Sequence, residues 1–179
     1  MTKPGALLLA PGASADRNHP TLLAIEAAVA PLPVARLDLP TRPPAAIQRI
    51  RDEAEALLVA NRKNPKSLAL GGRSFGGRMC SMAVAEGLAA SALVLISYPL
   101  HPPGKPESLR VDHFPDLEVP CLFVSGTKDP FGSPDELEQH TRTIVGSVTH
   151  LWIEGGGHAF KKHDVEVADA VAAWLKKVR

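Results

Sequence analysis

The chain has 179 residues, of which 45% are hydrophobic and 22% are charged, and its formal net charge is +1. These values are ordinary for a folded protein, and the length predicts a single domain over residues 1–179. Lysines and arginines form no long basic cluster. We therefore expect no nucleic-acid partner, because such a partner usually requires a basic patch.

Neither a membrane segment nor a disulfide framework is expected. No apolar run approaches the ~18 residues that a membrane-spanning helix needs. The first ten residues contain an apolar stretch, but Pro4, Gly5 and Pro11 leave it too short for a signal peptide, and a first strand explains it better. Cys80 and Cys121 are too few for a disulfide framework, so we expect two buried thiols and a cytoplasmic location.

Six short apolar runs alternate with helical patterns along the chain. The first run, at residues 6–10, is followed by a helical stripe that contains Leu22, Ile25 and Val29. The later runs lie at residues 34–39, 67–70, 92–97, 120–124 and 148–153, with further helical stripes between several of them. Strands that read as continuous apolar runs are typical of sheets buried on both faces. The alternation predicts an α/β fold with a parallel sheet and helices on both of its faces.

A Gly-x-Ser-x-Gly motif, Gly72-Arg-Ser-Phe-Gly76, follows the third run directly and precedes a helical pattern. A nucleophilic serine at this place needs a sharp, strained turn between strand and helix, and glycines two residues away on either side avoid collisions. The glycines do not read as a nucleotide site, because a P-loop needs Gly-Lys-Ser/Thr and a dinucleotide fold needs Gly-x-Gly-x-x-Gly after its first strand. The motif therefore indicates Ser74 as a nucleophile.

A serine hydroxyl needs a base, and the base needs a carboxylate to orient it. We favour His158, which follows the last strand within a run of glycines, over His101, which lies in a proline-rich stretch after the fourth run. Asp129, just after the fifth strand, is favoured over Asp135, because Asp135 lies in the first turn of a predicted helix, where a carboxylate suits the dipole. The order Ser, Asp, His is the order of α/β hydrolases.

The negative oxygen that forms during acyl transfer needs backbone N–H donors. The N–H of Phe75, at the start of the helix, is the expected first donor. The second should come from the loop after the first strand, where we favour Ala13 over Gly12. Arg73 and Lys128 could attract an anionic substrate, but the expectation for both is an exposed, solubilising charge. The residues expected at the substrate are Gly12, Tyr98, Leu100, His101 and Phe131.

Three segments carry a resemblance to the α/β-hydrolase superfamily, and to its small lid-less branch described as dienelactone-hydrolase-like. They are the GGRSFGGR, YPLHPPGK and SGTKD sequences at residues 71–78, 98–105 and 125–129. That branch includes a chromatin-complex subunit and a testis-expressed relative. The resemblance implies Ser74 as nucleophile, Asp129 as acid and His158 as base. It also implies a minimal sheet of about six parallel strands in the order 2-1-3-4-5-6, with no cap domain.

Two positions depart from the pattern of that branch. Ser74 stands where dienelactone hydrolases proper use cysteine, and Pro11 stands where the branch commonly has histidine. The first departure points away from dienelactone as the substrate. The second departure restricts the choice of the second N–H donor, because proline has no N–H and the donor must come from Gly12 or Ala13.

The expected function is that of a serine hydrolase that cleaves small esters or thioesters through an acyl-enzyme on Ser74. No set of histidine, cysteine and carboxylate residues has the spacing of metal ligands, so we expect neither a metal nor an organic cofactor. The alternatives are a non-catalytic interaction module with the same fold and a peptidase. The sequence leaves the acyl-chain length and the oligomeric state open.

Overall fold

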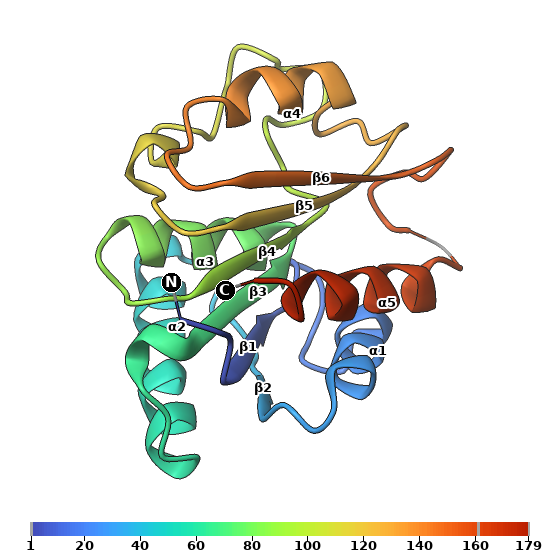
Figure 1. Cartoon of the computed structure of the whole chain (residues 1–179). Coiled ribbons are helices and arrows are strands. Elements are labelled where there is room, and N and C mark those ends of the chain that lie inside the picture. Colours follow the sequence, from blue (N-terminus) through green and yellow to red (C-terminus); the bar gives the residue numbers. More distant parts are fainter. Residues whose placement is uncertain (1, 161, 179) are drawn as a thin grey trace.

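A computed structural model describes residues 2–160 and 162–178. Its strands pair only in parallel and form a six-stranded sheet in the order β2-β1-β3-β4-β5-β6 (Figure 1). The predicted strand order is therefore confirmed. The strands are β1 (Ala6–Ala10), β2 (Val34–Arg36), β3 (Leu68–Arg73), β4 (Ala92–Ile96), β5 (Cys121–Gly126) and β6 (Val148–Ile153).

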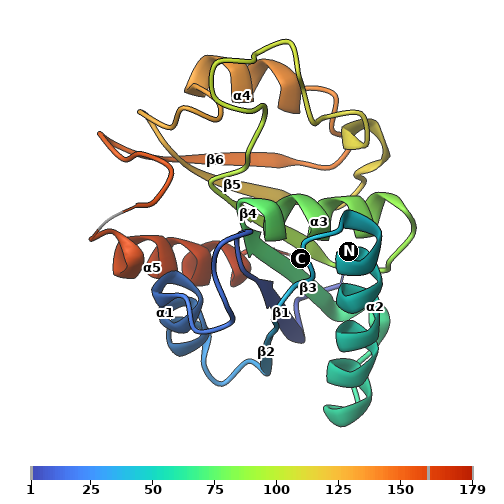
Figure 2. The ribbon, with the colours of Figure 1, turned by 180° about the vertical axis from the view of Figure 1, so that it is seen from behind.

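Helices cover both faces of the sheet, as predicted. On one face α1 (Pro20–Val29) and α5 (Asp164–Leu175) lie side by side, and on the other lie α2 (Pro43–Ala60) and α3 (Phe75–Ala85) (Figures 1 and 2). The short α4 (Pro134–Thr141) lies near β6, and a capping box forms at its start between Ser133 and Glu136. Within the described residues, no separate cap domain stands over the sheet.

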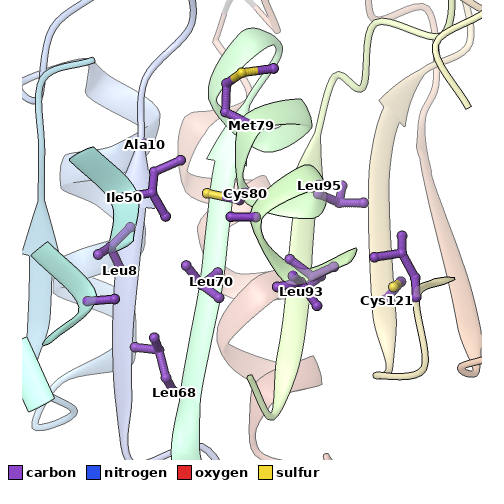
Figure 3. Packing of buried hydrophobic residues seen from close by; sticks show 14 of the residues in the cluster. Leu8, Ala10, Ile50, Leu68, Leu70, Met79, Cys80, Leu93, Leu95 and Cys121 are labelled. Atoms are coloured by element: carbon purple, nitrogen blue, oxygen red, sulfur yellow. The ribbon is translucent and has the colours of Figure 1, made fainter. Parts of the chain in front are cut away.

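The alternation of side chains along each strand divides the core into two layers. Leu8, Leu70 and Leu93 face α2 and α3, where they pack with Met79 and Cys80 (Figure 3). Neighbouring residues on the same strands belong to the other layer, beneath α1 and α5. Every residue of β1, β3, β4 and β5 is buried, which is why these strands read as continuous apolar runs.

The long connection between β4 and β5 is anchored in the core. It contains the 3-10 turn η2 (Phe114–Asp116), and the Tyr98 ring lies 5.3 Å from that of Phe114 and 5.8 Å from that of Phe123.

A second 3-10 turn, η1 (Pro65–Ser67), precedes β3. Among the described helices, none is both long and apolar enough to cross a membrane.

Candidate active site

Ser74 lies in the sharp turn that joins β3 to α3. Its φ of 50° and ψ of −117° are a conformation that residues other than glycine rarely adopt. Two hydrogen bonds hold the turn: the Ser74 N–H donates to the Ile96 carbonyl at 2.8 Å, and the Ser74 carbonyl accepts from the Arg78 N–H at 3.1 Å. The strained backbone conformation of Ser74 is therefore held by β4 on one side and by the first turn of α3 on the other.

The two glycines of the motif permit a close backbone approach. A Cβ atom on Gly72 would lie 2.5 Å from the nitrogen of Gly77, and one on Gly76 would lie 2.4 Å from the carbonyl oxygen of Pro11. Both distances are far below a van der Waals contact, and both neighbouring atoms belong to the backbone. Only glycine fits at either position, which is the steric reason for the motif.

The side chain of His158 lies within hydrogen-bond distance of both Ser74 and Asp129, one at each ring nitrogen. The His158 Nε2 atom is 2.8 Å from the Ser74 Oγ atom. On the other side of the ring, His158 Nδ1 is 2.8 Å from Asp129 Oδ2 and 3.0 Å from Oδ1. A proton on Nδ1 donates to the carboxylate and leaves Nε2 free to accept from the serine hydroxyl. The structure brings together the three residues that the sequence singled out, and it brings neither Asp135 nor His101 to this position.

The loop after β6 packs closely against the end of β5, and this contact positions His158 beside Asp129. A Cβ atom on Gly126 would lie 2.1 Å from the Gly156 carbonyl oxygen, and that oxygen accepts from the Lys128 N–H at 2.8 Å. The His158 ring also stacks on Phe131, with centroids 4.1 Å apart and planes 29° apart. The imidazole is therefore held by packing as well as by its hydrogen bonds.

Two donors from other loops hold the backbone of His158. The Ser97 hydroxyl, just after β4, donates to the His158 carbonyl at 3.0 Å, and an Arg73 Nη2 donor reaches the same oxygen. Arg73 is only 9% exposed, so the expectation of an exposed charge was wrong for this residue, although Lys128 is exposed as expected. Burial lowers the pKa of Arg73, and the nearby Asp129 carboxylate acts in the opposite direction.

A cavity of about 570 Å³ opens beside Ser74 and His158. Phe75 and Ala13, whose N–H groups were expected to bind a negative oxygen, both line it. The N–H of Phe75 lies in the first turn of α3, where an N–H has no partner within the helix. The other lining residues are Gly12, Ser14, Ala15, His19, Arg73, Arg78, Pro99, Arg110, Phe131 and Ala159.

Three of the expected substrate contacts are corrected by the structure. Gly12 and Phe131 line the cavity, but Tyr98, Leu100 and His101 do not. Tyr98 is 1% exposed and Leu100 is fully buried, because the chain after β4 turns inward and packs both side chains into the core. His101 is also buried, and its Nε2 atom lies 3.4 Å from a Glu136 oxygen rather than at the cavity.

Three ionisable residues of the cavity wall were missed by the sequence analysis. Arg78 follows Ser74 by four residues, and this spacing places both on one side of α3, which could have identified it. Arg110 lies in the long connection after β4, and no sequence signal marks its side chain. His19 caps the start of α1, and burial, followed by the charge of Arg73, lowers the pKa of its imidazole.

The described residues show no metal-binding cluster. Within residues 2–160 and 162–178, no three His, Cys, Asp or Glu side chains lie where they could hold a metal ion. That neither a metal nor an organic cofactor takes part stays a prediction.

Comparisons with known proteins agree on the fold. A family model described as "Alpha/beta hydrolase domain" matches residues 3–178. Est1E from Butyrivibrio proteoclasticus is similar with a TM-score of 0.80 and 16% identity, over 98% of this chain and 88% of that one. Dienelactone hydrolase from Anabaena variabilis is similar with a TM-score of 0.80 and 18% identity, over 98% of this chain and 87% of that one. An esterase domain of a Rhodothermus marinus protein is similar with a TM-score of 0.75 and 16% identity, over 98% of this chain and 88% of that one.

Proposed function

The chain belongs to the α/β-hydrolase family, and we propose that it is a serine hydrolase that cleaves small esters or thioesters. The observation that carries this proposal is the line of contacts from Asp129 through His158 to Ser74, in which no step exceeds 3.0 Å. The likeness to a chromatin-complex subunit and a testis-expressed relative stays a prediction. We also propose that the whole chain acts as one domain.

In the first half of the reaction the substrate acylates Ser74. The Ser74 oxygen attacks the carbonyl carbon while His158 Nε2 takes the hydroxyl proton. The negative oxygen of the tetrahedral intermediate accepts from the N–H groups of Phe75 and Ala13, a stabilisation typically worth about 2.7–4 kcal/mol per donor. The intermediate then loses its alcohol or thiol, which leaves with the proton held by His158.

In the second half water releases the acyl group. A water molecule attacks the acyl carbon and gives a proton to His158, the bond to the Ser74 oxygen breaks, and that oxygen recovers the proton from the imidazolium. The products are a carboxylic acid and the free enzyme. Asp129 stays ionised throughout, because it only orients the ring and stabilises its charged form.

A panel of p-nitrophenyl esters with short acyl chains tests the proposal. We expect release of p-nitrophenol by the wild-type chain and a fall in kcat of about 10⁶-fold in Ser74→Ala. Ser14→Ala is the matched control, since Ser14 also lines the cavity but makes no hydrogen bond to His158. A folded wild-type chain with no more turnover than Ser74→Ala would contradict the proposal.

A fluorophosphonate probe separates the alternatives. Labelling of Ser74 in the wild type supports an activated nucleophile, whereas a folded chain that does not label would favour a non-catalytic interaction module. A peptidase is tested by comparing turnover of an ester and an amide with the same acyl group. We expect the ester to be cleaved far faster.

A reducing compartment suits the two cysteines. Cys80 and Cys121 are free thiols, both buried, and burial raises the pKa of each, that of Cys121 to about 12. Unpaired thiols are typical of cytoplasmic proteins, so we propose that location.

A further inference from the structure

The charged residues that line the candidate active-site cavity are all positive. Three arginines, Arg73, Arg78 and Arg110, line it, and no aspartate or glutamate of the described residues does. The one carboxylate of the triad, Asp129, lies behind the His158 ring and is 6% exposed. A cavity with positive walls attracts negatively charged ligands and raises their local concentration.

None of these three arginines forms an ion pair within 4.0 Å among the described residues, and only the side chain of Arg73 has another partner, the His158 carbonyl. Four other arginines of the chain, Arg17, Arg36, Arg49 and Arg51, each pair with a carboxylate. Arg78 and Arg110 form no ion pair within 4.0 Å among residues 2–160 and 162–178, and the Nε atom of Arg78 is buried without a hydrogen-bond partner.

Arg78 and Arg110 line the same cavity, so the charge of each acts on the other. Burial lowers the pKa of Arg110, and the charge of Arg78 lowers it further. The exposed Asp112 lies two residues from Arg110 but does not pair with either arginine. Two like charges on the wall of one cavity without an ion-pair partner disfavour each other, and an anion bound in that cavity would offset this cost.

Both side chains are positioned relative to Ser74 by ordered backbone. Arg78 lies one turn of α3 beyond Ser74, about 6 Å along the helix axis. The backbone of Arg110 is held at both ends: its N–H donates to the Leu100 carbonyl at 2.9 Å, and its carbonyl accepts from the buried Tyr98 hydroxyl at 2.7 Å. The long connection after β4 thus brings a second guanidinium to the wall of the cavity that also contains Ser74.

We propose that Arg78 and Arg110 bind a carboxylate or phosphate group carried by the substrate, so that the substrates are esters or thioesters with a second, anionic end. This inference rests on the proposed serine hydrolase. A guanidinium suits such anions because two of its N–H groups match the spacing of two anion oxygens. If the arginines served only to stabilise the negative oxygen at the reacting carbon, they would favour charged and neutral esters equally.

The test compares esters that differ in charge but not in the reacting bond. The probes are mono-p-nitrophenyl adipate, its neutral methyl ester, and a p-nitrophenyl ester whose acyl chain ends in a phosphonate. We expect kcat/KM of the wild type to be at least ~10-fold higher for an anionic ester than for the neutral one. Arg78→Gln and Arg110→Gln should each lower this ratio about 10-fold, whereas the exposed Arg142→Gln control should keep the wild-type ratio.

A binding measurement makes the outcome independent of turnover. By calorimetry, adipate or inorganic phosphate should bind the wild type and Arg142→Gln equally, and each arginine variant of the cavity at least ~10-fold more weakly. Adipamide, which is neutral, should not show this difference. Equal kcat/KM for charged and neutral esters in the wild type would overturn the inference and leave the proposed hydrolase intact. If no ester is cleaved, the proposed function fails and the calorimetry alone decides the anion site.

Discussion

Ser74 is the residue where local backbone and chemistry are most closely linked. Its positive φ costs conformational free energy of order 1–3 kcal/mol, and hydrogen bonds to Ile96 and Arg78 compensate for this cost. The same turn points the hydroxyl at the imidazole of His158. The strained turn and the glycines on either side of it therefore place the Ser74 Oγ atom at the cavity.

Asp129→Asn is predicted to lower kcat by about 10⁴-fold. An amide NH₂ at this position would donate to Nδ1, so that the proton moves to Nε2 and the ring can no longer accept from Ser74. The measurement is steady-state hydrolysis of the best p-nitrophenyl ester, with circular dichroism to verify folding. Asp135→Asn is the matched control, because Asp135 is exposed in the first turn of α4 and should leave kcat unchanged. A similar loss in both variants would contradict the role of Asp129.

At the scale of elements, the position of His158 depends on segments at the carboxyl ends of four strands. Arg73 ends β3, Ser97 follows β4, Asp129 follows β5 and His158 follows β6. The carboxyl ends of parallel strands lie at one edge of the sheet, so these segments meet there. Because Arg73 and Ser97 both donate to the His158 carbonyl, they are positioning residues for the histidine rather than partners of its ring.

Ser97→Ala is predicted to lower kcat/KM about 10-fold while changing stability by only about 1 kcal/mol. The loss of one donor should loosen the His158 loop and lengthen its contact with Ser74. The rate of fluorophosphonate labelling should fall with kcat/KM, which a purely structural role would not cause. Ser125→Ala provides the control, since Ser125 is equally buried at the end of β5 but its hydroxyl has no partner among the described residues. An unchanged labelling rate in Ser97→Ala would refute the positioning role.

For the molecule as a whole, the arginines of the cavity also affect how stability depends on pH. His113 lies near Arg78, and its Nε2 atom is 2.7 Å from the Ser81 hydroxyl. Burial, and then the charge of Arg78, lower the pKa of His113 to about 4. Its value in the unfolded chain is near 6.5. Between these two values the unfolded chain binds a proton that the folded chain does not, so stability falls as the pH falls.

The expected loss from His113 between pH 7.5 and pH 5 is about 2 kcal/mol of unfolding free energy. Urea unfolding of the wild type and of His113→Gln at both pH values measures it. The variant should lose less stability on acidification, because glutamine binds no proton in either state. Burial lowers the pKa of His150 as well, so part of the acid sensitivity should remain. Equal losses in the two proteins would show that His113 does not contribute.

The sequence by itself determined the parallel α/β class, the helices on both faces and the residues of the predicted triad, whereas the order of the strands was predicted from the resemblance to α/β hydrolases. Each of the first three depends on local signals: apolar runs that fill two layers, a turn at Ser74 that tolerates only glycine two residues away, and strand ends that share one edge. Because the carboxyl ends of parallel strands share one edge of the sheet, residues that follow different strands become spatial neighbours.

Only the tertiary structure decided which side chains line the cavity. Tyr98 and Leu100 read as cavity walls because they follow a strand, yet both are buried in the core. Arg73 read as an exposed charge but is buried against the His158 carbonyl, and Arg110 reaches the cavity from a long connection whose path depends on Tyr98. Burial and charge proximity depend on contacts between segments far apart in the chain, which neither periodicity nor local motifs encode.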